Sequence, residues 1–156
     1  MNGQALCDIV SLMTRRQVLA AMAAAPAASA QIAPDIVRRH DERVADYVKK
    51  QQENGSFPDG YGFYNAGTAA VLIGAFTAAL LHPQSRYHKD RGLFERLQRA
   101  SSFLTKCQNS EGNIDLLITN FNSPPDTAFV THHVATAACL AKRQGEAEGL
   151  ALIEPF

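Results

Sequence analysis

Hydrophobic residues recur at three- and four-residue steps in two stretches of the chain, a spacing that is typical of amphipathic helices. In residues 33–51 one stripe consists of Ile36, Val37, His40, Val44, Tyr47 and Val48, and the other face consists of Arg38, Arg39, Asp41, Glu42, Lys49 and Lys50. In residues 90–106 the stripe consists of Leu93, Leu97, Ala100 and Leu104. Both stretches are predicted to be outer, half-exposed helices.

Two further stretches carry almost no charge. Residues 66–82 read AGTAAVLIGAFTAALLH, which has no charged side chain on any helical face, so a buried helix over about 65–82 is predicted. Residues 125–142 are rich in alanine and threonine and open with Pro125 and Asp126, which suit the first turn of a helix. These two segments are predicted to be inner helices.

The outer and inner helices alternate, so the chain is predicted to be a repeat. Tyr47-x-x-Lys50-x-Gln52 matches Phe103-x-x-Lys106-x-Gln108 at an offset of 56 residues, and Thr77-Ala78-Ala79-Leu80 matches Thr136-Ala137-Ala138-Cys139 at 59. A period of this length with two helices per unit is typical of stacked helical hairpins. The fold class is therefore all-α, with both long loops at the same end of the stack.

The N-terminal residues have the pattern of a secretory leader. Thr14-Arg15-Arg16-Gln17-Val18-Leu19 is a twin-arginine pattern, a short apolar segment follows, and Ala28-Ser29-Ala30 fits a cleavage site. Residues 1–30 are predicted to be a twin-arginine-type signal peptide, and residues 31–156 a periplasmic or secreted domain with no membrane attachment after leader cleavage. The alternative is an alanine-rich helix of the folded domain.

Charge and cysteine content argue against two classes of function, nucleic-acid binding and zinc binding. The chain has 15 Lys and Arg against 15 Asp and Glu, without a basic cluster, which argues against nucleic acid as a partner. No cysteine and histidine spacing suits zinc, so neither a metal site nor a cofactor is predicted. Cys107 and Cys139 are expected to be separate, buried thiols; the alternative is a disulfide between them, which export would permit.

The turns between outer and inner helices carry a resemblance. Gln51-x-x-x-Gly55-x-Phe57 and Gln108-x-x-x-Gly112-x-Ile114 resemble the Gln-x-x-x-Gly-x-aromatic turns of (α/α) toroids, although the second lacks the aromatic residue. Of these families, an exported toroid with polar, aromatic loops is most similar to the heparinase-type polysaccharide lyases. The resemblance implies a polysaccharide or oligosaccharide substrate. It also implies an N-terminal fragment of a toroid, with two hairpins and the start of a third, which needs missing C-terminal repeats or self-association to close.

Residues of the two loops and of the second inner helix are the candidates for chemistry. A lyase needs a base for the proton beside a carboxylate, an acid for the leaving oxygen and donors for the developing enolate. The catalytic candidates are Tyr61, Tyr64, Asn120, Asn122, His132 and His133. The candidates for substrate binding are Asp59, Asn65, Asp115 and Asp126.

Other interpretations of these residues stay open. The loop around Asn120 and Asn122 has side chains suited to satisfying its own backbone, the histidines to contacts between helices, and Asp126 to the start of a helix. Asp59, Asp115 and Asp126 could instead supply the carboxylate pair of a glycoside hydrolase. A non-catalytic helical-repeat domain that binds a glycan or a protein is the remaining alternative.

Overall fold

The computed structural model describes residues 32–115 and 122–153, and these residues form five helices. The helices are α3 (Pro34–Lys50), α4 (Ala66–Leu81), α5 (Arg91–Cys107), α6 (Pro124–Gln144) and α7 (Ala147–Ile153). The described ranges contain no strand, so the all-α prediction is confirmed, and the helix boundaries lie within one or two residues of the predicted ones. The predicted leader, residues 1–30, lies outside the described part of the chain.

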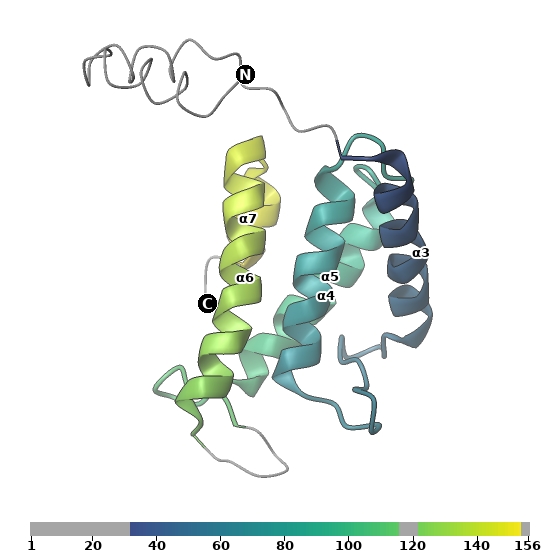
Figure 1. Ribbon diagram of the computed structural model, residues 1–156. Helices are drawn as coiled ribbons and strands as arrows, with labels where there is room; N and C mark the ends of the chain where they lie inside the picture. The colour runs from purple at the N-terminus through teal and green to yellow at the C-terminus, as the bar shows by residue number, and fades with distance from the viewer. Residues whose placement is uncertain (1–31, 116–121, 154–156) are drawn as a thin grey trace, which may run out of the picture. The chain divides into compact units, whose positions relative to one another are not determined.

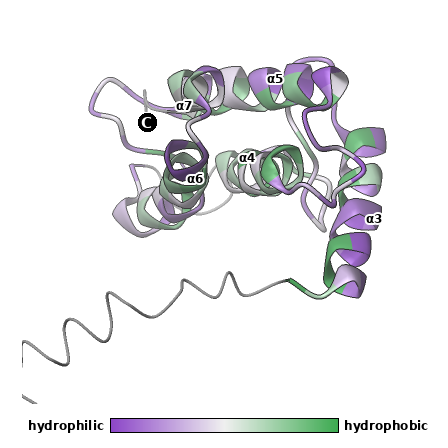
Figure 2. Ribbon diagram, turned by 90° about the horizontal axis from the view of Figure 1, so that it is seen from above, coloured by the Kyte–Doolittle hydropathy of each residue, from purple (hydrophilic) through white to green (hydrophobic). Residues whose placement is uncertain are grey.

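Helix α4 lies at the centre of the arrangement, between α3, α5 and α6 (Figures 1 and 2). Its lack of charge makes this possible, because every face can be buried without desolvating an ion. Leu72, Ile73 and Phe76 are fully buried, and Leu93, Leu97 and Leu104 of α5 complete the same core. The predicted stripe of α5 is thus confirmed.

Short polar side chains fix where the inner helices begin. The Asn65 side chain accepts a hydrogen bond from the Thr68 N–H at 3.0 Å and caps α4. Ser123 caps α6 in the same way, with Pro124 and Pro125 in the first turn, where a missing N–H carries no penalty. As predicted, both inner helices start at the same end of the bundle (Figure 1).

The two turns share two backbone hydrogen bonds, Gln52 N–H to Ser56 O and Gly55 N–H to Gln52 O in the first and the equivalent pair in the second. The Gln51 side-chain amide donates to the Gly55 carbonyl at 3.3 Å, and the Gln108 amide donates to the Gly112 carbonyl at 3.5 Å. Both glycines have positive φ, +90° and +81°. These bonds align the turns at an offset of 57 residues, so the 56-residue alignment of Gln52 with Gln108 is wrong by one position. Ile114, 3% exposed, fills the place of the missing aromatic residue.

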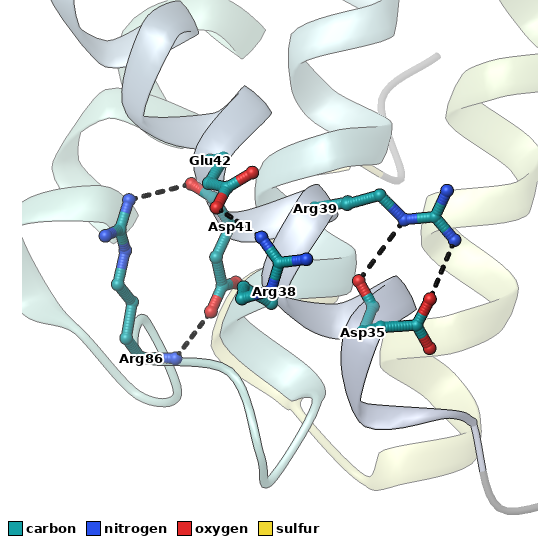
Figure 3. Close-up of polar contacts among 6 residues, drawn as sticks. All are labelled: Asp35, Arg38, Arg39, Asp41, Glu42 and Arg86. Carbon is teal, nitrogen blue, oxygen red and sulfur yellow. Dashed lines mark hydrogen bonds and ion pairs between the residues drawn. The ribbon is translucent and has the colours of Figure 1, made fainter.

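Two residues of α3 depart from the predicted helix faces. Asp41 is 6% exposed although its charge placed it on the solvent face, whereas Ile36, assigned to the apolar stripe, is half exposed. Asp41 is buried because the turn after α4 supplies two donors. The Ser85 hydroxyl donates to its carboxylate at 2.6 Å. The Arg86 N–H donates to the same carboxylate at 2.9 Å (Figure 3). The Arg86 guanidinium also donates to the Asp41 carbonyl at 2.9 Å. A carboxylate with a hydrogen bond to each of its oxygens thus ties α3 to the turn after α4.

Replacing Asp41 with alanine is expected to lower the free energy of unfolding by about 2–3 kcal/mol, because two donors lose a charged acceptor. Glu42→Ala is the matched control: its carboxylate is exposed and pairs only with Arg38, one turn away, so we expect a change of less than about 0.5 kcal/mol. Urea unfolding followed by circular dichroism measures both. Equal effects of the two substitutions would contradict the structural role of Asp41.

One face of α6 is open to solvent. The side chains of Val130, Val134, Ala137 and Ala141 pack inward, while Phe129, His132 and Cys139 are exposed. The expectation of a buried thiol is therefore wrong for Cys139, because it lies on the face that no described element covers. Cys107 is half-buried, and burial raises the pKa of its thiol.

Candidate functional site

A cleft of about 350 Å³ lies where the first two turns of α4 and the first three turns of α6 meet the loop that follows α5. Both helices begin at the same end of the bundle (Figure 1), and residues of their first turns line the cleft. Four of the ten predicted site residues line the cleft: Asn65, Asp115, Asp126 and His133. The rest of the lining is apolar or small and consists of Ala66, Gly67, Val71, Ile114, Phe129 and Val130.

The two aspartates are held by the loop that precedes α6. The Asp115 carboxylate accepts a hydrogen bond from the Asn122 N–H at 2.6 Å, and the Asp126 carboxylate accepts one from the Ser123 hydroxyl. The Ile114 N–H donates to the Thr127 hydroxyl at 3.0 Å, which fixes the start of the loop against the helix. Both carboxylates therefore have defined positions at the edge of one cleft.

Asn65 lines the cleft and also has a structural role. Its side-chain oxygen caps α4, and its side-chain nitrogen donates to Asp59 at 3.1 Å. Asp59 in turn accepts hydrogen bonds from the N–H groups of Tyr61 and Phe63 and closes a tight turn. Asp59 is thus a turn residue that supports Asn65 and does not line the cleft.

Two side chains of the cleft, His133 and Phe129, take no part in the hydrogen bonds that hold the loops and the helix ends. His133 is exposed, its ring lies edge-on to the ring of His132 at 5.8 Å, and the described residues give its side chain no hydrogen-bond partner. Phe129 is 73% exposed, one helical turn before His133. An imidazole and an open aromatic face are therefore available to a ligand.

The electrostatics of the cleft are mixed. Each helix N-terminus acts as roughly half a positive charge. The first turn of α4 contains no acidic residue, whereas that of α6 contains Asp126, and Asp115 faces the same space. Two carboxylates outweigh two helix ends, so the cleft does not select strongly for an anion.

The other predicted residues lie elsewhere. Tyr61 is 88% exposed, and Tyr64 lines a separate shallow surface beside the first turn. Asn122 has φ +54°, and its side-chain oxygen accepts from the Asn109 amide at 3.1 Å. His132 is exposed but does not line the cleft, and Asn120 lies outside the described residues.

Phe129 and Val130 were not among the predicted residues, although the sequence contains the signal. Asp126, Phe129, Val130 and His133 follow the i, i+3, i+4, i+7 spacing of one helical face. By the same spacing, His133 lies seven residues after Asp126 on one helical face, so it could have been chosen over His132 from the sequence. Pairing this face with Asn65 needed the packing of α6 against α4.

Comparisons of the chain with family models, with curated proteins and with solved structures found no match. Among the described residues no helix is long and apolar enough to cross a membrane. The same part of the chain contains no cluster of three or more His, Cys, Asp or Glu side chains that could hold a metal ion.

Proposed function

We propose that these helices are part of an (α/α) toroid that degrades polysaccharides, and that the cleft between α4 and α6 is its saccharide site. The observation that carries the proposal is the meeting of His133, Asp115, Asp126 and Asn65 beside the open ring of Phe129. An aromatic face suits the C–H surface of a sugar ring, and carboxylate and amide groups suit its hydroxyls. The helical hairpins and their repeated turns support the architecture.

β-Elimination on a uronic-acid-containing glycan is the first candidate reaction. His133 removes the proton from the carbon beside the carboxylate, the bond to the leaving oxygen breaks, and a carbon–carbon double bond forms in conjugation with the carboxylate. The proton count is completed when an acid protonates the leaving oxygen. The N-terminal end of α4, which has no acidic residue in its first turn, is the place for the substrate carboxylate.

Hydrolysis of a glycosidic bond is the second candidate. It is favoured by Asp115 and Asp126, two carboxylates that line one cleft, since a pair of carboxylates is the usual equipment of glycoside hydrolases. In this reaction one carboxyl group protonates the leaving oxygen, and the other activates water or attacks the sugar. His133 and Asn65 then position the substrate.

The test is to incubate the purified chain with a uronic-acid polymer and with a neutral polymer, and to follow two signals. Elimination raises ultraviolet absorbance, because it creates a conjugated double bond, and also creates new reducing ends. Hydrolysis creates reducing ends without the absorbance. If neither signal appears while the chain is folded by circular dichroism, the catalytic proposal is wrong. Affinity electrophoresis in gels containing each polymer then tests the alternative of a non-catalytic binding domain.

A further inference from the structure

Four residues form a strip along the open face of α6, which we call the outer strip. Ala128, His132, Ala135 and Cys139 follow steps of four, three and four residues, so they share one helical face, and all four are exposed. The outer strip lies opposite the side of α6 that packs inward. Figure 2 shows α4 on that inward side and no described helix on the other.

The absence of charge distinguishes this face from the exposed faces of the other long helices. On α3 the Arg38 guanidinium pairs with Glu42 at 2.7 Å, and on α5 Arg91 lies 3.9 Å from Glu95. Residues 127–141 of α6, by contrast, contain no Asp, Glu, Lys or Arg. Charged side chains are depleted at the centres of protein interfaces. The outer strip therefore has the composition of an interface and not of a face adapted to water.

The packing of α4 shows what covers an uncharged helix in this fold. α4 packs so closely against α6 that a Cβ added to Gly74 would lie 4.0 Å from the His133 carbonyl oxygen. One uncharged inner helix is thus buried against another. α4 is already packed against α3, α5 and α6. The inner helix that remains to cover the outer strip is α6 of a second copy of the chain.

We propose that the outer strip binds the outer strip of a second copy of this chain, with the two α6 helices antiparallel about a twofold axis. In this orientation Ala128 faces Cys139 of the other copy, and His132 faces Ala135, because each pair is equidistant from the middle of the strip. Each larger side chain meets an alanine, so the strip is its own complement, as a twofold interface requires. None of the four residues lines the cleft, so the proposal is independent of the saccharide function.

The cations at the end of α6 favour the antiparallel orientation. Lys142 and Arg143 lie in the last turn of the helix. Parallel helices would bring the cations of both copies together. Antiparallel helices separate the two Lys142 residues by roughly 25 Å along the axis, at a rise of 1.5 Å per residue. This distance exceeds the screening length of about 8 Å at physiological ionic strength, so the repulsion is small.

Sedimentation equilibrium of the purified chain tests the pairing. We expect the mass of two chains at high concentration and of one chain on dilution. Ala135→Glu places an unpaired carboxylate in each strip beside the twofold axis, so it is expected to raise the dissociation constant by at least about a hundredfold. Ser102→Glu is the matched control, because it adds the same charge at an exposed position of α5, and we expect it to leave the dissociation constant unchanged.

Disulfide cross-linking tests the orientation. A disulfide requires two Cα atoms within about 7 Å of each other. Ala128→Cys is therefore expected to give a covalent dimer on mild oxidation, and the additional substitution Cys139→Ser is expected to abolish it. In the parent chain the two Cys139 residues lie roughly 16 Å apart along the axis, so they are not expected to cross-link.

The proposal is overturned by a single-chain mass at every concentration, or by equal dissociation constants of Ala135→Glu and the parent chain. A mass that grows beyond two chains, as head-to-tail stacking would give, also overturns it. So does a cross-link through Cys139 in the parent chain. Circular dichroism checks the fold of each variant, and if Ala135→Glu fails to fold, the cross-linking of Ala128→Cys decides.

Discussion

Replacing Gly55 with alanine is expected to lower the free energy of unfolding by about 3–5 kcal/mol. Two effects combine. The φ of +90° is strained for any residue with a Cβ, and the added Cβ would lie 2.0 Å from the carbonyl oxygen of Arg99. That oxygen belongs to the backbone of α5, so the contact is relieved only if the turn moves away from that helix.

Gly112 separates these two effects. It occupies the same place in the second turn with φ +81°, and an added Cβ meets no atom within 4 Å. Gly112→Ala therefore carries the backbone strain alone, about 1–2 kcal/mol. Thermal and urea unfolding measure the loss of stability in Gly55→Ala and in Gly112→Ala. The difference between the two losses is the steric contribution at Gly55. Similar losses in the two variants would show that α5 does not pack against the first turn as described.

Replacing His133 with glutamine is expected to lower kcat/KM on the cleaved polymer by about a hundred- to ten-thousandfold, the usual contribution of a general base. The prediction depends on the proposed elimination. His132→Gln is its control, because the neighbouring ring is also exposed but does not line the cleft. We expect His132→Gln to retain nearly full activity.

The outcome of this pair also distinguishes the candidate reactions. If His133→Gln mainly raises KM and leaves kcat within a few-fold, the imidazole binds substrate and the carboxylates perform the chemistry. If His132→Gln is the more damaging substitution, the cleft between α4 and α6 is not the site of reaction. Circular dichroism of each variant confirms that the helices are retained.

The helices could be predicted because their signals are local. The period of Leu93, Leu97 and Leu104 defines a face without knowledge of its partner, and the uncharged α4 has no face suited to water. Burial of Asp41 could not be predicted, since its donors on Ser85 and Arg86 are more than forty residues away along the chain. A prediction from sequence places a charged side chain on the surface unless its hydrogen-bond partners can be identified.

The candidate site could likewise be predicted only in part. That the loops after α3 and α5 meet at one end followed from the order of outer and inner helices. Which side chains face the cleft depended on hydrogen bonds within each loop: Asp59 folds its own turn and leaves Tyr61 in solvent. The choice of His133 over His132 followed from the helical spacing to Asp126, whereas pairing this face of α6 with Asn65 depended on the packing of α6 against α4.

The largely buried position of α4 has a consequence during synthesis of the chain. The ribosome completes α4 before α5 and α6, and roughly 60 residues separate the end of α4 from the end of α6. At about 5–20 residues per second, the uncharged helix waits several seconds for the partners that cover it. Until α5 is complete at Cys107, α3 alone shields it, and α6 is still absent after that. The nascent chain is therefore most exposed to chaperones and to aggregation while its second hairpin is being translated.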